Sequence, residues 1–153
     1  MSYSFARENF EATYPEIEPL YRQHYKEMSD RLSEQGVELA PYAPRLKEYC
    51  AYGNTDFLMT LILRHEGKAV GYCNVYVTTD MHNGEIIATE DTLFVTKEHR
   101  NGVGKKLVAF ALSELKKRNV KRLLVSANTD LRVAKLWGRM GFKEIATQMA
   151  YTF

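Results

Sequence analysis

The chain has 153 residues, of which 45% are hydrophobic and 26% charged, so its size and composition suit one globular domain over residues 1–153. The longest apolar runs, such as Phe57 to Leu63, are too short to cross a bilayer, and no apolar stretch of signal-peptide length begins the chain, so we expect a cytoplasmic protein without a membrane partner. The net charge is only +2, but residues 99–144 carry 12 Lys and Arg against 3 Asp and Glu, which indicates either a polyanionic ligand in that half or a set of solvated helix faces.

The N-terminal third predicts a short strand followed by helices. Tyr3 to Ala6 is strand-like, and Pro15 and Pro19 introduce a helical stretch that Gly36 can end. Apolar and aromatic residues recur in this stretch at spacings of three and four and form one amphipathic face, on which lie Leu20, His24, Met28 and Leu32. Core packing is the favoured interpretation of this face, and the alternative is that Met28 and the neighbouring tyrosines line an acceptor pocket. A loop with two prolines follows, and Leu46 to Tyr52 predicts a short helix.

The middle of the chain predicts three strands, over Phe57 to Arg64, Ala69 to Thr79 and Ile86 to Val95. Short turns separate them, one at Glu66-Gly67 and one at Asn83-Gly84, a pair that tolerates positive φ. Strands joined by such tight turns should form an antiparallel meander.

After Val95 the apolar period changes to that of a helix. Residues on one helical face include Leu107, Val108, Ala111, Leu112 and Leu115. A strand is then expected over Val120 to Ala127, a helix from Asp130 to about Met140 with Gly141 after its end, and a last strand over Phe142 to Phe153. The resulting order, β-α-βββ-α-β-α-β, predicts a mixed sheet with helices on its faces.

The stretch from Leu93 to Leu107 carries the clearest chemical signal. A strand ends, a loop with Gly102 and Gly104 follows, and a helix begins. The first turn of a helix has unpaired N–H groups and the positive end of the helix dipole, so this turn is suited to a phosphate. A Walker A loop needs Lys followed by Ser or Thr, but Lys106 follows Lys105, and Leu107 stands where the third glycine of a dinucleotide loop belongs. An ordinary glycine-containing turn is the alternative interpretation.

This stretch resembles the acyl-CoA-binding motif of the GCN5-related N-acetyltransferase (GNAT) family, in which Arg or Gln precedes two residues, Gly, one residue, and Gly or Ala. Gly102 and Gly104 match its glycines, while His99 falls in the Arg/Gln position and Arg100 is one residue closer. The resemblance implies an α/β (α+β) fold, with a mixed, mainly antiparallel sheet of about six strands and helices on both faces. It also implies that acetyl-CoA is bound by Leu93, Phe94, Val95, Arg100, Asn101, Gly102, Val103, Gly104, Lys105, Asn128 and Asp130.

A downstream segment supports the resemblance. The family often has Asn, two residues, Ala, three residues, Tyr, three residues and Gly-Phe, and here Asp130, Val133, Trp137 and Gly141-Phe142 occupy those places. Asp130 replaces the Asn that often contacts the coenzyme, and Asn128 is an alternative. The matched motifs extend from Glu90 to Phe142.

Trp137 is the departure that bears on mechanism. The family often has a tyrosine in that position, whose phenol protonates the departing thiolate, whereas an indole N–H is a donor only. Packing of the last helix on the sheet is the alternative role for this aromatic ring. Water or another tyrosine, such as Tyr151, would then return the proton.

Glu90 and Asp91 are the candidates for a catalytic base. In this family an acidic residue on the corresponding strand often removes a proton from the amine, which is protonated at pH 7. Adjacent strand residues face opposite sides of a sheet, so only one of the two should face the cleft, and we favour Glu90. A solvated strand carboxylate is the alternative for either residue.

The resemblance implies an N-acetyltransferase that moves the acetyl group of acetyl-CoA to a primary amine by direct attack. The thioester would lie between the strand Glu90 to Val95 and the strand Lys121 to Ala127, where a backbone N–H near Val95 polarises its carbonyl. The acceptor is a small molecule or a protein. The alternative is a catalytically weak acyl-CoA-binding module that acts through a protein partner.

Other ligands are less favoured. The basic half lacks the interleaved aromatics of a single-strand binder, so nucleic acid is not the expected partner. Two cysteines without a CxxC pair and four histidines without ligand spacing predict no metal. The sequence leaves a homodimer open.

Overall fold

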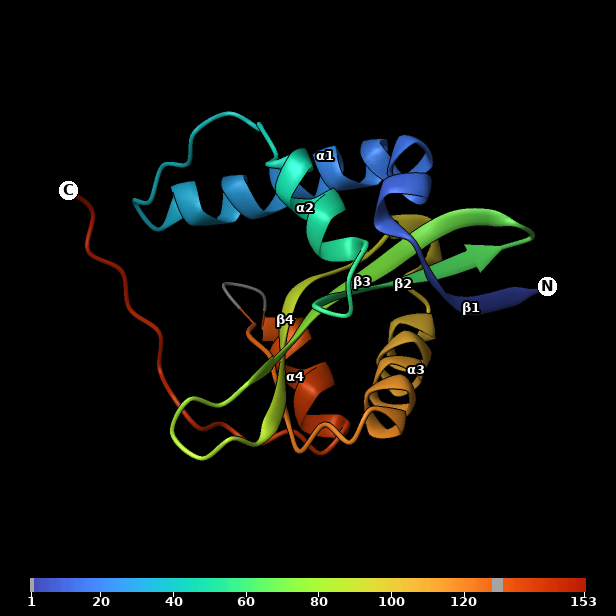
Figure 1. The fold of residues 1–153 in the computed structure, drawn as a ribbon. Helices are drawn as coiled ribbons and strands as arrows, with labels where there is room; N and C mark the ends of the chain where they lie inside the picture. Colours follow the sequence, from blue (N-terminus) through green and yellow to red (C-terminus); the bar gives the residue numbers. More distant parts are fainter. Residues whose placement is uncertain (1, 128–130) are drawn as a thin grey trace.

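The computed structural model describes residues 2–127 and 131–153 (Figure 1). In chain order its elements are β1 (Tyr3–Glu8), α1 (Phe10–Glu34), α2 (Leu46–Gly53), β2 (Leu58–His65), β3 (Lys68–Thr79), β4 (Ile86–Val95), the 3₁₀ turn η1 (Lys97–His99), α3 (Val103–Lys117), β5 (Leu123–Leu124) and α4 (Leu131–Arg139). No helix in this part of the chain is long and apolar enough to span a membrane.

The strands form one sheet in the order β1-β2-β3-β4-β5. The pairs from β1 to β4 are antiparallel, as expected for a meander, and β5 runs parallel to β4. The predicted mixed, mainly antiparallel sheet is therefore confirmed. The β4–β5 pairing extends over two residue pairs only, Ala88 with Leu123 and Thr89 with Leu124.

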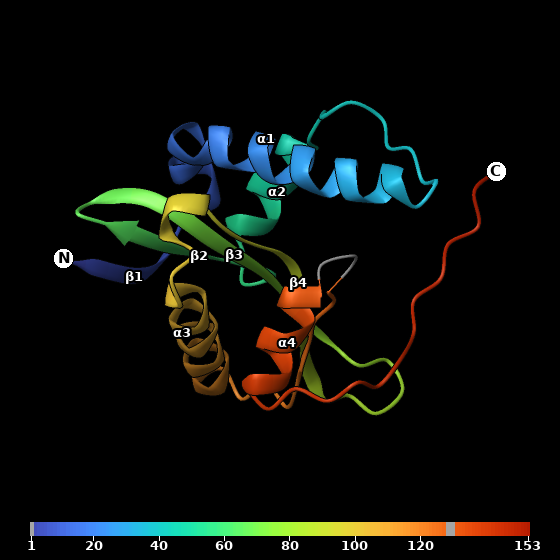
Figure 2. The same ribbon diagram turned by 180° about the vertical axis from the view of Figure 1, so that it is seen from behind.

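Helices cover both faces of the sheet, with α1 and α2 on one side and α3 and α4 on the other (Figures 1 and 2). On the α1 side, Phe10, Ile17 and Tyr21 pack with strand residues such as Tyr72. On the α3 side, the predicted helical face packs on strand residues that include Leu61 and Val75. The buried residues of β2, β3 and β4 thus form two cores, one on each face of the sheet.

A β-bulge interrupts β4. Asn74 pairs with Thr92, but its neighbour Val75 pairs with Glu90, so Asp91 is the extra residue opposite β3. The bulge changes which side chains face which core: Ala88 lies on the α3 side before it, whereas Val95 lies on that side after it. The alternation of side chains between the two faces of β4 is therefore interrupted at Glu90 and Asp91.

Helix α1 begins earlier than expected. The prolines Pro15 and Pro19 lie inside it, and Asn9 caps it by accepting a hydrogen bond from the Ala12 amide at 2.9 Å. Each proline removes one helical hydrogen bond, but the capped first turn and the burial of Phe10 and Ile17 hold the helix on both sides of them.

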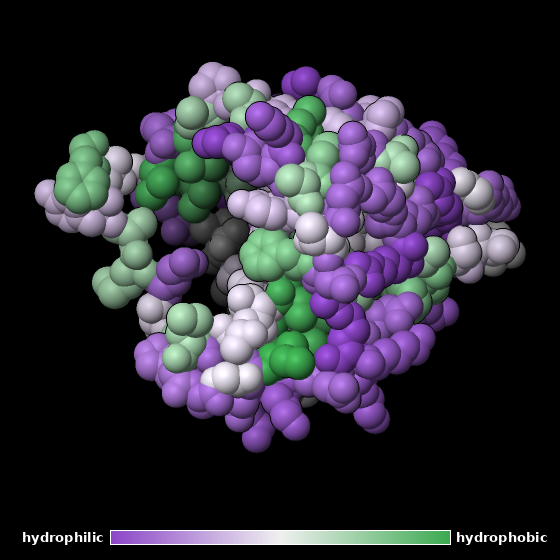
Figure 3. Space-filling view, viewed as in Figure 1, coloured by the Kyte–Doolittle hydropathy of each residue, from purple (hydrophilic) through white to green (hydrophobic). Residues whose placement is uncertain are grey.

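The C-terminal prediction is partly wrong. The helix α4 and the left-handed Gly141 after it are present, with φ +93°. However, only Leu123–Leu124 of the expected strand Val120 to Ala127 forms a strand, although Lys121 and Arg122 also hydrogen bond to the backbone of β4. Residues 142–153 form no strand. This last segment stands away from the body with its apolar side chains exposed (Figure 3). The short β5 gives this segment little edge to pair with.

Candidate active site

A cavity of about 540 Å³ opens where β4 and β5 separate. The second half of β4 forms one wall, and the other walls come from α1, the start of α3, residues 126–127 and α4. The lining residues are His24, Glu27, Met28, Arg31, Glu90, Thr92, Leu93, Phe94, Val95, Arg100, Gly102, Gly104, Lys105, Ser126, Ala127, Arg132, Val133, Leu136 and Arg139. The predicted strand split and the predicted glycine turn therefore meet at one cavity.

Glu90 lines this cavity. Burial, and then the charge of the neighbouring Asp91, raise the pKa of Glu90 to about 7. A carboxyl group with this pKa is about half ionised at neutral pH. Such a group can take a proton from a reacting amine and release it afterwards.

Asp91 does not line the cavity. Its carboxylate lies on the opposite face of β4 and accepts a hydrogen bond from the Tyr49 hydroxyl at 2.9 Å. Burial raises the pKa of Asp91, and the hydrogen bond from Tyr49 opposes that shift. The bulge thus separates the two candidate bases, and only Glu90 faces the cavity.

The glycine turn places the start of α3 at one end of the cavity. Gly102 has φ +100°, a left-handed conformation that favours glycine, and it immediately precedes the helix. A Cβ atom at Gly104 would meet only the Val95 side chain, at 4.0 Å, so there is open space over the turn. The first N–H groups of α3 and the Lys105 side chain can therefore reach an anion there.

Two predicted coenzyme residues in this loop do not line the cavity. The Val103 side chain is buried in the core on the α3 side. Asn101 donates to the Tyr3 hydroxyl at 3.4 Å. Asn128 and Asp130, also predicted to contact the coenzyme, lie outside the described residues.

Arg100, rather than His99, faces the cavity. The His99 ring turns away and its Nδ1 hydrogen bonds to the Tyr3 hydroxyl at 2.8 Å. Arg100 donates from Nε to the Val95 carbonyl at 2.7 Å, and its guanidinium pairs with Glu27 at 3.0 Å. This arginine therefore ties α1 to the end of β4, and part of its charge is already balanced.

Helix α1 contributes to the cavity wall, whereas the sequence favoured core packing over a pocket lined by Met28 and the nearby tyrosines. His24 lies in the cavity wall, stacked on Phe94 with ring centres 5.0 Å apart, and its Nδ1 hydrogen bonds to the Tyr72 hydroxyl at 2.9 Å. Burial lowers the pKa of His24 to about 4, so the ring is neutral at pH 7. The helical spacing of His24 and Met28 was visible in the sequence, but it equally indicates a core-facing helix.

Trp137 is buried beside the cavity, not in its wall. Its indole N–H donates to the Ser126 carbonyl at 3.1 Å, and its ring packs against Phe142. The predicted packing role of this tryptophan agrees with these contacts. Tyr151, the other candidate for returning a proton, lies exposed in the C-terminal segment.

The side chains do not suggest a metal centre. Over residues 2–127 and 131–153 no group of three or more His, Cys, Asp or Glu is placed to hold a metal ion.

Comparison with known proteins shows the family to which this chain belongs. The model of the Acetyltransferase (GNAT) family matches residues 10–142. Similar solved structures include an aminoglycoside acetyltransferase from an uncultured soil metagenomic sample, with 18% identity over 100% of this chain and 99% of that chain and a TM-score of 0.76. A ribosomal-protein-alanine N-acetyltransferase from Brucella melitensis biovar Abortus 2308 is 15% identical, with 99% of this chain and 100% of that chain covered and a TM-score of 0.72. AAC(6')-Iy, in complex with a bisubstrate analogue of CoA, is 17% identical, with 100% of this chain and 99% of that chain covered and a TM-score of 0.73. No curated protein matches by sequence.

Proposed function

This chain belongs to the acetyltransferase family known as GNAT, whose enzymes use acetyl-CoA, and from that premise we propose that it transfers the acetyl group to a primary amine by direct attack. The observation that carries the proposal is the position of Glu90. This half-ionised carboxyl group lies in a cavity that also reaches the N-terminus of α3, so one cavity contains a base and an anion site.

The residues around α3 fit the pyrophosphate of the coenzyme. Open space above Gly102 and Gly104 lets a phosphate approach the backbone N–H groups, and Lys105 adds positive charge. Arg31, Arg132 and Arg139 line the same cavity and contribute further positive charge. When bound, acetyl-CoA supplies an acetyl group already activated as a thioester.

The backbone of β4 can polarise the thioester carbonyl. Thr96 donates its N–H to Val70 of β3 at 2.9 Å, so the alternation of an antiparallel ladder turns the N–H and carbonyl of Val95 away from β3. The Val95 carbonyl accepts a hydrogen bond from Arg100 Nε. The Val95 N–H is then available for the oxygen on which negative charge develops.

Glu90 acts as the general base in this proposal. The ammonium form of the acceptor loses a proton to the Glu90 carboxylate, and the free amine attacks the thioester carbon. The new C–N bond forms as the C–S bond breaks. The Trp137 indole N–H is already hydrogen bonded to the Ser126 carbonyl, so the departing thiolate takes its proton from water. The hydroxide left by that water then takes the second proton from the acetylated nitrogen.

A second candidate is an acyl-CoA-binding module that is catalytically weak and acts through a protein partner. The use of the Trp137 N–H in a structural hydrogen bond favours it, since the side chain supplies no acid to the thiolate. Thiol release from acetyl-CoA in a panel of small amines, amino acids, aminoglycosides and peptides tests the two candidates. Amine-dependent release with an acetylated product supports the enzyme, whereas CoA binding without release by any amine supports the module.

A further inference from the structure

The glycine turn before α3 is held by a side chain from the first strand of the sheet. Tyr3, in β1, has its hydroxyl oxygen 2.8 Å from His99 Nδ1, and Asn101 Nδ2 donates to the same hydroxyl oxygen at 3.4 Å. An amide Nδ2 group can only donate, so the hydroxyl accepts from Asn101 and its own hydrogen is left for His99. One hydroxyl group therefore connects two residues of the turn to β1.

Tyr3 is itself fixed in the sheet. Residues Tyr3–Glu8 pair antiparallel with β2 without a break in register, and Tyr3 pairs with His65. The Tyr3 ring packs against the core on the α3 side, and its centre lies 4.8 Å from that of the His65 ring. The His65 ring is in turn 4.8 Å from the His99 ring between centres. The hydroxyl is thus held by a paired strand and by contacts among three rings.

The two residues that Tyr3 contacts flank Arg100, which lines the active-site cavity. Neither His99 nor Asn101 lines that cavity, because both side chains turn toward Tyr3. Gly102 and the first turn of α3, the proposed anion site, follow directly in the chain. The contacts of Tyr3 therefore fix the segment that presents both the Arg100 side chain and the start of α3 to the cavity.

We propose that Tyr3 is a positioning residue for the coenzyme, whose hydroxyl holds the turn where Arg100 and the first N–H groups of α3 meet the pyrophosphate. This rests on the proposed binding of that pyrophosphate at the glycine turn. Tyr3 does not line the cavity, so it acts through His99 and Asn101. Without the hydroxyl the ring stays in the core, but the turn loses its preorganisation, and binding then includes the cost of ordering it.

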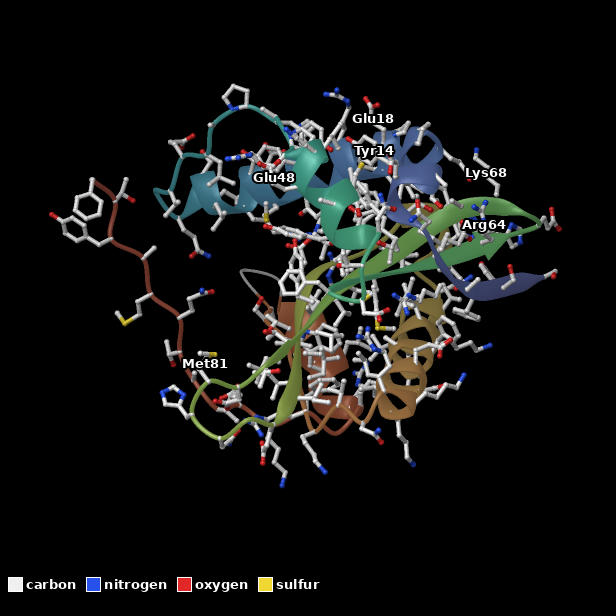
Figure 4. All side chains as sticks on the ribbon, viewed as in Figure 1. Tyr14, Glu18, Glu48, Arg64, Lys68 and Met81 are labelled. Carbon is white, nitrogen blue, oxygen red and sulfur yellow. The ribbon has the colours of Figure 1, made fainter. Side chains whose placement is uncertain are left out.

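Tyr3→Phe tests the inference because it removes only the hydroxyl group. Calorimetry should show CoA bound about three- to tenfold more weakly, the range expected when a hydrogen-bonded contact is lost. Tyr14→Phe is the matched control, since it removes a tyrosine hydroxyl that hydrogen bonds to the Tyr42 hydroxyl at 2.7 Å. Tyr14 lies on α1, across the sheet from α3 (Figure 4), and this variant should keep CoA affinity within twofold of the parent.

A second acetyl donor separates positioning of the turn from a general loss of structure. S-acetylpantetheine carries the thioester but has no pyrophosphate, so it makes no use of the glycine turn. With one amine acceptor, Tyr3→Phe should lower kcat/KM for acetyl-CoA about three- to tenfold and leave kcat/KM for S-acetylpantetheine within twofold. An equal fall for both donors would show a purely structural role and would overturn the inference.

His99→Phe removes the same contact from the turn and keeps an aromatic ring beside Tyr3 and His65. It should weaken CoA binding about as much as Tyr3→Phe does. The double variant should bind CoA within twofold of Tyr3→Phe, because the two changes remove one shared interaction. Fully additive losses would mean that the two side chains act separately, which contradicts the proposed role of the hydroxyl.

Comparison with Gly104→Asp separates failure of this inference from failure of the proposed function. If Gly104→Asp weakens CoA binding while Tyr3→Phe and His99→Phe leave it unchanged, the glycine turn binds the coenzyme and the role of Tyr3 is wrong. If CoA binding depends on Tyr3 but no amine releases thiol, the inference is supported and the proposed acetyl transfer is wrong. Unchanged CoA affinity in all three variants would overturn both the role of Tyr3 and the anion site on which it rests.

Discussion

Glu90 and Asp91 are neighbours in the chain, yet Glu90 lines the cavity while Asp91 accepts a hydrogen bond from Tyr49 on the other face of the sheet. The bulge at Asp91 fixes this arrangement, because it follows Glu90 directly and changes the facing of the residues after it. Two adjacent carboxylates thereby receive different surroundings, one beside the α3 anion site and the other among tyrosines. Each should respond differently to substitution.

Replacement of Gly104 by Asp should weaken CoA binding at least tenfold, or ~1.4 kcal/mol. The substitution adds a negative charge and bulk at the start of α3, in space that is open in this structure. Calorimetry on the folded variant measures the effect. Gly138→Asp makes the same chemical change in α4, where nothing lies within 4 Å, and should leave affinity within twofold. Equal affinities for both variants would mean that phosphate is bound away from the glycine turn.

Replacement of Trp137 by Phe should lower stability more than it lowers turnover. The change removes the donor to the Ser126 carbonyl and leaves space in a site where the tryptophan is only 5% exposed. We expect a loss of about 1–3 kcal/mol in the free energy of unfolding, measured in urea. The rate of thiol release per folded molecule should fall less than threefold. A hundredfold fall without loss of stability would show that the indole takes part in the reaction.

Replacement of Glu90 by Gln should stabilise the protein at alkaline pH. The pKa of Glu90 is raised from 4.5 to about 7, so the folded state holds this proton more tightly than the unfolded chain. The stabilisation from the neutral carboxyl is full below pH 4.5 and is lost as pH rises through 7. The variant keeps a neutral side chain throughout. It should therefore be more stable than the parent by about 1–3 kcal/mol at pH 8 and equally stable near pH 4. A variant that is less stable than the parent at pH 8 would contradict the raised pKa.

Local patterns predicted the parts of the fold and site that depend on local chemistry. The left-handed conformation at Gly141 follows from a glycine just after a helix and occurs as expected, while the glycine turn at Gly102 precedes a helix as predicted. The meander follows from short turns between apolar runs. Strand alternation predicted that only one of Glu90 and Asp91 faces the cleft, although the bulge at Asp91 has no signal in the sequence.

The remaining features depend on contacts between distant segments. Arg100 pairs with Glu27, 73 positions earlier, and this contact brings α1 into the cavity wall. No local pattern distinguishes such a residue from an ordinary exposed charge. Likewise, residues 142–153 were expected to form a strand, but strand formation needs a partner edge and β5 pairs with β4 over two residue pairs only. The sequence shows Trp137, but it does not show that the Ser126 carbonyl accepts the hydrogen bond from the indole N–H.

The pH dependence of amine acetylation in Glu90→Gln, compared with Asp91→Asn and the parent, tests the mechanism most directly. With the best acceptor of the amine panel, Glu90→Gln should lower kcat at pH 7 by roughly 10²- to 10⁴-fold, the usual effect of losing a general base. The loss should shrink as pH rises, because free amine becomes abundant, and CoA affinity should remain within twofold. In the parent, kcat should rise with pH through a midpoint near 7, the pKa of Glu90. Asp91→Asn should retain the parent kcat, with a midpoint below that of the parent, because the charge of Asp91 contributes to the raised pKa of Glu90. An unchanged kcat and pH midpoint in Glu90→Gln would contradict the assignment of Glu90 as the base.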